Sequence, residues 1–217
     1  MIDGKTVTYT LAQGISDQAK TYGPVFSRLV AKESVKLLGK LLSQSPPDID
    51  TLDGAASYIM SNLNRCPRGY ACLAYGVGKA ISTLEGSVGG GAKMFTKSFL
   101  MAAMKKSGLA KASGSTSTID AVIAYRKLSL AIRLAEEGSG TFSGSEHEAN
   151  IKVTDCDYAN ACIETIREGT SRAIGGNVCV WGVSYGVYAE IATSMQHDYK
   201  MIKTEPPNCE LVVFRQE

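Results

Sequence analysis

The stretch Val178–Met195 constrains the fold more than any other part of the chain, because it is apolar on almost every side of a helix. Such a helix lies either in a protein core or across a membrane. Its length is close to what a bilayer requires, but its glycines, Ser184, Glu190 and the following His197-Asp198 are unfavourable for spanning. We therefore predict a helix buried in the core of a globular protein, and no transmembrane segment.

One side of this helix carries small residues. Cys179, Gly182, Gly186 and Ala189 recur at spacings of three and four, which places them in a single stripe. Each glycine weakens the helix by roughly 1 kcal/mol relative to alanine. We therefore expect another surface to lie close against the stripe, either a neighbouring element or a flat ligand.

Short strands surround the helix in the sequence. Residues 149–154 alternate between apolar and polar side chains, which is typical of a half-buried strand, and Thr141 and Phe142 begin a preceding strand. Residues 199–204 and 209–215 flank a proline-containing turn and are expected to form a hairpin. Both faces of 209–215 are apolar, which predicts a central strand.

Helical periodicity dominates the N-terminal half of the chain. The expected helices cover residues 16–23, 25–42, 51–64, 70–84, 93–106 and 119–137, and a later one covers 158–174 and ends at Gly175-Gly176. Residues 6–9 are expected to form a short strand or a docking arm. Because the other strands are confined to the second half, we predict an α+β fold. In it, N-terminal helices pack with a small C-terminal antiparallel sheet and two buried helices.

The domain organisation allows two interpretations. Residues 108–118 are small, polar and dotted with lysines, which predicts a linker between a helical region, 1–107, and an α+β region, 119–217. With 217 residues the chain is also short enough for both regions to share one core.

Composition narrows the classes of function. The net charge is only +2, and no lysine and arginine stripe is interleaved with aromatic residues, so we expect no nucleic-acid partner. The first 13 residues lack the basic start and apolar run of a signal peptide, so a cytoplasmic location is expected. In that compartment the six cysteines are expected to be reduced thiols or metal ligands.

Three segments carry a resemblance to a known family: Ile151–Cys156, Cys179–Gly186 and Cys209–Val213. The order of these segments and the positions of their cysteines resemble those of the 4-vinyl-reductase domain. This domain is a small-molecule-binding module related in fold to TRAPP-type trafficking subunits. The resemblance covers residues 141–215. The chain has Cys156-Asp157 where that family has cysteine-proline, and Pro207-Asn208 where it has glycine-aspartate. The layout is also similar to that of aminothiazoline-carboxylate hydrolase-like proteins.

The cysteines are candidates for a zinc site or a reactive thiol. Cys156, Cys162, Cys179 and Cys209 lie at junctions that the predicted fold would bring together, and thiolates suit Zn²⁺. The chain has no Cys-x(2)-Cys knuckle, and the alternative is that these cysteines are simply buried. Cys156 would follow a strand and precede a helix whose dipole would lower the thiol pKa. A catalytic base would then have to be His147 or His197.

Ligand binding is the function that this pattern favours. We expect a hydrophobic small molecule to lie in a cysteine-rich pocket between the C-terminal helices and the sheet. The expected ligand-binding residues are Cys179, Trp181, Gly182, Tyr185, Gly186 and Glu190. A buried Glu190 would have a raised pKa and act as an acid or ligand anchor, whereas on a polar face it would be solvated.

Catalysis is the less favoured interpretation, and no catalytic residue is assigned. The alternatives are a thiol- or carboxylate-dependent hydrolase of small cyclic amides and a TRAPP-like assembly subunit. In the second alternative the amphipathic N-terminal helices make a dimer or a larger assembly, as in the trafficking relatives. A homodimer is the expected oligomer.

Overall fold

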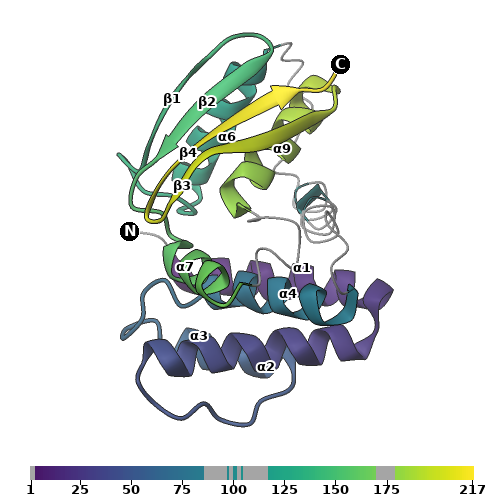
Figure 1. Cartoon of the computed structure of the whole chain (residues 1–217), viewed down its shortest axis with the longest axis vertical. Coiled ribbons are helices and arrows are strands. Elements are labelled where there is room, and N and C mark those ends of the chain that lie inside the picture. The colour runs from purple at the N-terminus through teal and green to yellow at the C-terminus, as the bar shows by residue number, and fades with distance from the viewer. Residues whose placement is uncertain (1–2, 86–96, 98–99, 102–103, 105–116, 170–178) are drawn as a thin grey trace. The chain divides into compact units, whose positions relative to one another are not determined.

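The computed structural model describes residues 3–85, 97, 100–101, 104, 117–169 and 179–217, and the α+β class is confirmed (Figure 1). The chain forms two compact units. The helical unit comprises residues 3–94 and 160–178, and the sheet unit comprises residues 95–159 and 179–217. The predicted linker 108–118 lies almost wholly outside the described residues. The predicted division of the chain therefore stays a prediction.

The helical unit is built from amphipathic helices. They are α1 (Gly4–Tyr22), α2 (Pro24–Leu41), α3 (Leu52–Ser61), α4 (Ala71–Glu85) and, from residue 160 onward, α7 (Ala159–Arg167). Helices α2 and α4 pack closely at Gly76, where a Cβ atom would lie 2.5 Å from the carbonyl oxygen of Val30. Glycine at this position therefore lets the two helix backbones approach one another.

Ion pairs join α7 to the other helices of this unit. The Glu164 carboxylate pairs with Lys40 of α2, and the Glu168 carboxylate accepts hydrogen bonds from Tyr75 (2.6 Å) and Lys79 (3.1 Å) of α4. Helix α7 is shorter than the expected 158–174. The chain turns at Gly169, whose φ of 71° favours glycine. Gly175-Gly176, the expected end of the helix, lies outside the described residues.

The expected strand or arm at residues 6–9 is wrong, and so is the start of the first helix at residue 16. Helix α1 begins at Gly4, because the Asp3 carboxylate caps it by accepting hydrogen bonds from the amides of Lys5 and Thr6. The Thr8 hydroxyl also donates to the Gly4 carbonyl oxygen at 2.6 Å, which accommodates this β-branched residue in the helix. Pro24 occupies the first turn of α2, as expected.

Helix α6 (Thr118–Ala131) is the first fully described element of the sheet unit. The Ser117 hydroxyl caps it by accepting a hydrogen bond from the Asp120 amide at 3.4 Å. The helix ends at Ala131 rather than at the expected Glu137, because Arg133 turns the chain with a φ of 58°. Of the helix expected over 93–106, only residues 97, 100–101 and 104 are described, and they are helical.

The sheet is antiparallel, and its strands lie in the order β1-β2-β4-β3. The strands are β1 (Gly140–Gly144), β2 (Glu148–Val153), β3 (His197–Glu205) and β4 (Asn208–Arg215). Leu211 of β4 lies opposite Ile151 of β2 on one side and Met201 of β3 on the other. The predicted central position of the last strand is therefore confirmed.

Helices α6 and α9 (Val180–Thr193) cover one face of this sheet (Figure 1). The α9 helix is buried over most of its length, as predicted. A Cβ atom at Gly182 would lie 2.5 Å from the Tyr199 ring, so β3 presses against the small-residue stripe at this point. Among the described residues no helix is both long and apolar enough to cross a bilayer.

Candidate functional site

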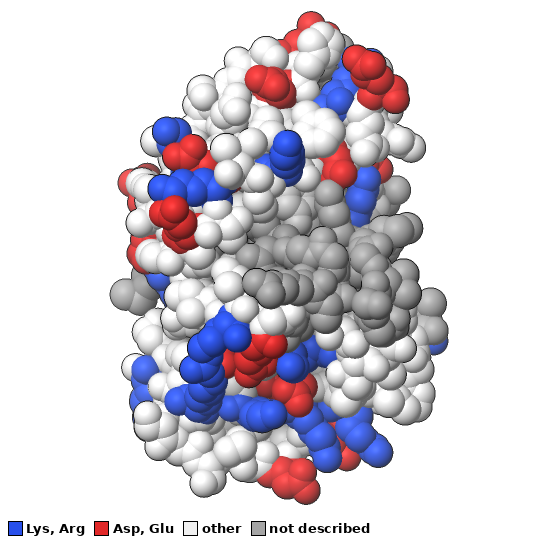
Figure 2. Space-filling view, viewed as in Figure 1, with Lys and Arg blue, Asp and Glu red and all other residues white. Residues whose placement is uncertain are grey.

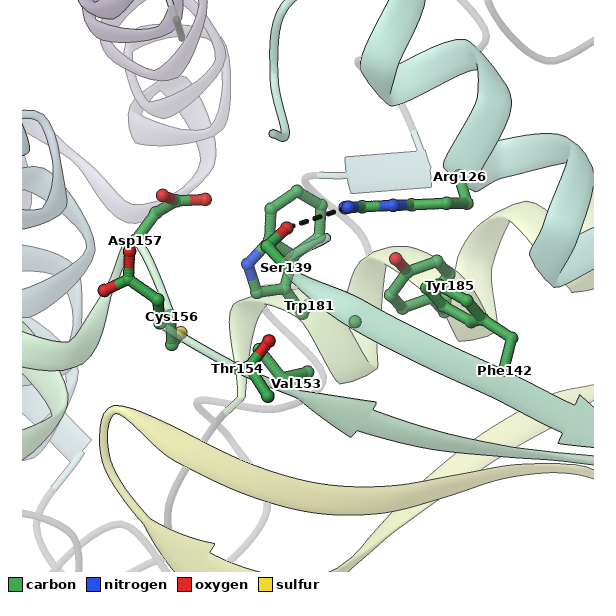
Figure 3. A pocket seen from close by; sticks show the side chains of 11 residues that line it. Arg126, Ser139, Phe142, Val153, Thr154, Cys156, Asp157, Trp181 and Tyr185 are labelled. Carbon is green, nitrogen blue, oxygen red and sulfur yellow. Dashed lines mark hydrogen bonds between the residues drawn. The ribbon is translucent and has the colours of Figure 1, made fainter. Parts of the chain in front are cut away.

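A hollow opens in the sheet unit where β2 ends and α9 begins (Figure 3). Its volume is about 260 Å³, including space open to solvent, and its enclosed part is about the size of one water molecule. The side chains that line it include Arg126, Ser139, Phe142, Val153, Thr154, Cys156, Asp157, Trp181 and Tyr185. Four elements of the sheet unit (α6, β1, β2 and α9) and two connections therefore contribute to one small site.

Aromatic rings form one wall of the hollow. Trp181 and Tyr185 are one helical turn apart on α9, so both project from the same face, and their ring centroids are 5.9 Å apart. The Phe142 ring of β1 meets Tyr185 edge-on at 5.7 Å. Behind them, Tyr125 of α6 contacts Tyr185 at 5.2 Å. These contacts hold the two α9 side chains in place.

Arg126 brings a nearly buried positive charge to the hollow, with only 8% of its surface exposed. Its Nη2 donates to the Glu136 carbonyl oxygen and to the Ser139 hydroxyl, the latter at 2.8 Å. Its Cζ lies 5.7 Å from the centre of the Phe142 ring, a cation–π contact. No aspartate or glutamate in the described part of the chain forms an ion pair with Arg126.

Cys156 lies at the edge of the hollow as a neutral thiol. Its amide donates to the Pro207 carbonyl oxygen at 3.0 Å, which ties it to the turn between β3 and β4. Burial, with smaller contributions from Cys179, Asp157 and Cys209, raises the pKa of Cys156 to about 12. The expectation that a helix dipole would lower this pKa is wrong, because the cost of desolvating the thiolate is larger.

The other predicted metal ligands are distributed over both units. The Cys179 sulfur caps α9 by accepting from the Gly182 amide at 3.3 Å, and Cys209 is buried at the start of β4. Cys162 lies on α7 in the helical unit. The described residues contain no group of three or more His, Cys, Asp or Glu arranged to hold a metal ion. Zinc binding by these four cysteines stays a prediction.

Glu190 and His197 lie toward the other end of α9, away from Trp181. The Glu190 carboxylate pairs with Lys97 at 2.8 Å and accepts from the His197 amide at 3.3 Å. The His197 ring is buried, with Nδ1 2.8 Å from the Met195 carbonyl oxygen and Nε2 3.0 Å from the Thr118 hydroxyl. His147 is exposed. Neither histidine lines the hollow with Cys156.

Of the six residues expected to bind ligand, Trp181 and Tyr185 line the hollow. Cys179 caps the N-terminus of α9. Gly182 lies in the first turn of this helix, against the Tyr199 ring. At Gly186 a Cβ atom would meet no described atom within 4 Å. The structure therefore brings together the two aromatic residues with Cys156, and it separates them from Glu190.

Sequence reasoning missed Arg126. The available signal was its place in a helical stripe with Val122 and Ser129, both of which are fully buried. An arginine at spacings of four and three from such residues is expected to point inward.

A basic stripe on α2 is a second candidate surface. Arg28, Lys32, Lys36 and Lys40 are spaced by four residues, and each has an acidic partner, in order Asp50, Asp48, Glu33 and Glu164. Figure 2 shows blue and red side chains intermixed over this part of the surface. Paired charges of both signs offer no continuous positive field to an anionic partner.

The chain was also compared with known proteins. No protein-family model matches it, and no curated protein does. The resemblance to 4-vinyl-reductase domains therefore stays a prediction from the sequence.

Proposed function

We propose that the sheet unit is a small-molecule-binding module whose ligand occupies the hollow. The observation that carries this proposal is that Trp181 and Tyr185, which the α9 sequence singles out, line the same hollow as Cys156. Ligand sites combine apolar and aromatic walls with a few placed polar groups. The hollow has this composition.

The size of the hollow limits the ligand. Its enclosed part is about the size of one water molecule, far below the roughly 300–1,000 Å³ of typical ligand pockets, because the volume of about 260 Å³ includes open solvent. The proposed ligand therefore lies in the open part of the hollow, and only a small group of it enters the enclosed part. The rings of Phe142, Trp181 and Tyr185 favour a flat apolar body, in keeping with the hydrophobic ligand implied by the family resemblance.

Thiol-dependent hydrolysis receives no support from the site. A nucleophilic cysteine acts as the thiolate, and Cys156 holds its proton at neutral pH because its pKa is about 12. No histidine lines the hollow to take that proton. The assembly-subunit hypothesis and the homodimer stay predictions.

Fluorescence tests the proposal directly, because Trp181 is the sole tryptophan of the chain. A compound that enters the hollow is expected to change Trp181 emission saturably and to raise the melting temperature of the full chain. A set of single-ring aromatic and alicyclic compounds, neutral and charged, is the appropriate screen.

A filling substitution provides the control. Thr154→Tyr places a ring in the hollow and should abolish the saturable response, whereas Thr141→Tyr, on the exposed side of β1, should retain it. Circular dichroism of both variants checks that the fold is intact. Saturable binding that is equal in both variants would overturn the assignment of the site.

A further inference from the structure

The buried charge of Arg126 calls for an explanation beyond packing. The guanidinium is always ionised in proteins, and removing it from water without an opposite charge is energetically unfavourable. Its hydrogen-bond acceptors, the Glu136 carbonyl and the hydroxyls of Ser139 and Tyr185, are neutral. The Phe142 ring offers only the weaker attraction of its π face.

A purely structural role explains part of this arrangement. Nη2 of Arg126 holds the turn that leads from α6 into β1. An uncharged side chain with an amide group could donate the same kind of hydrogen bonds without burying a charge. Anchoring the turn therefore does not account for the positive charge.

The remaining charged groups of the hollow do not neutralise Arg126. Asp155 and Asp157 also line it, but neither forms an ion pair with Arg126, and both have interactions of their own. In Figure 3, Asp157 and Cys156 lie on one side of Trp181, and Arg126 lies on the other side with Tyr185. The positive charge therefore sits at one end of the hollow.

Tyr185 adds a second donor at that end. Its hydroxyl oxygen lies next to the guanidinium (Figure 3) and accepts a hydrogen bond from Arg126, which leaves the hydroxyl proton for a ligand. Burial raises the pKa of Tyr185, so the hydroxyl keeps its proton at neutral pH. A guanidinium and a phenol that face the same space suit the two oxygens of a carboxylate.

We propose that the ligand of the hollow is a small ring-bearing carboxylate whose anionic group pairs with Arg126 and whose ring lies against Trp181. The inference rests on the proposed function and names the chemical class of its ligand. The carboxylate supplies the counter-charge that the described residues do not, and the aromatic wall supplies the contact for the ring.

Benzoate and benzamide are the probes that separate charge from shape. They have the same ring and nearly the same size, but only benzoate is anionic. Titrated into the full chain with Trp181 emission as the readout, benzoate should bind at least about tenfold more tightly than benzamide, because a charge-assisted bond replaces a neutral one. Its affinity should also fall as sodium chloride is raised, whereas that of benzamide should not.

Variants of Arg126 assign the preference to this residue. Arg126→Gln removes the charge and should make the two affinities equal, whereas Arg126→Lys should retain part of the preference. Lys127→Gln removes an exposed positive charge from the same helix outside the hollow and should keep the full preference. Should Arg126→Gln fail to fold, the lysine variant and the salt titration of the native chain still decide.

The outcomes separate this inference from the proposal on which it rests. Equal binding of benzoate and benzamide, or a preference that persists in Arg126→Gln, overturns the carboxylate inference and leaves a neutral-ligand site standing. No saturable response to benzoate also overturns it. The wider proposal fails only if neutral compounds give no response either.

Discussion

At the scale of single residues, the chemistry of the site depends on which side chains are desolvated. Trp181 and Tyr185 could be selected from the sequence because they lie on an apolar helix, where aromatic residues point inward. Arg126 was missed, since arginine on a helix is usually solvated. The helix dipole was weighed for Cys156, but burial, which sequence position does not reveal, dominates its pKa.

His197 should make stability depend on pH. Burial, with the nearby positive charges of Arg215 and Lys97, lowers its pKa from 6.5, against the opposing effects of the Met195 carbonyl and Glu190. The unfolded chain therefore binds the proton more readily than the folded one. Stability from this residue is present above about pH 6.5 and is lost as the pH falls toward the lower folded value.

Urea denaturation of the native chain between pH 8 and pH 5 measures this effect. His197→Gln should flatten the dependence in the window below pH 6.5, and His147→Gln, which alters the exposed histidine, should leave it in place. A native-like pH dependence in the His197 variant would show that another group is responsible.

At the scale of elements, α9 was predicted well because its apolar character extends around the whole helix. Its close contact was also anticipated from the glycines, although the sequence left open whether an element or a ligand would supply it. At Gly182 the close contact comes from an element of the fold, the Tyr199 ring of β3. The start of helix α1 was predicted wrongly because the β-branched residues there favour a strand. The Asp3 cap and tertiary packing stabilise a helix at this position instead.

Gly182→Ala should therefore destabilise the protein. The new methyl group would overlap the Tyr199 ring, and overpacking of this kind typically costs about 1–3 kcal/mol, more than the helix-propensity gain of alanine. Gly78→Ala on α4 is the matched control, because its Cβ would meet no described atom within 4 Å. It should stabilise by about 0.5–1 kcal/mol.

The free energy of unfolding, measured by urea titration followed by circular dichroism, compares the two variants. A gain in stability at residue 182 equal to that at residue 78 would contradict close packing of β3 against α9.

At the scale of the whole molecule, the α+β class followed from the distribution of periodicities, because helical periodicity runs through the whole chain and the strands lie only after about residue 140. The assignment of residues 160–178 to the helical unit could not be predicted in this way. It depends on contacts such as those of Glu164 and Glu168 with α2 and α4, which join positions far apart in the chain. Local patterns carry no information on such pairings.

Native mass spectrometry of the full chain, after incubation with a mixture of small ring-bearing metabolite analogues and gentle removal of excess, tests the central claim most directly. The account predicts a complex of one chain with one small molecule for the native protein and for Thr141→Tyr, and the free chain for Thr154→Tyr. Free chain alone in all three samples, or the same complex in all three, would contradict a ligand site in the hollow beside Trp181.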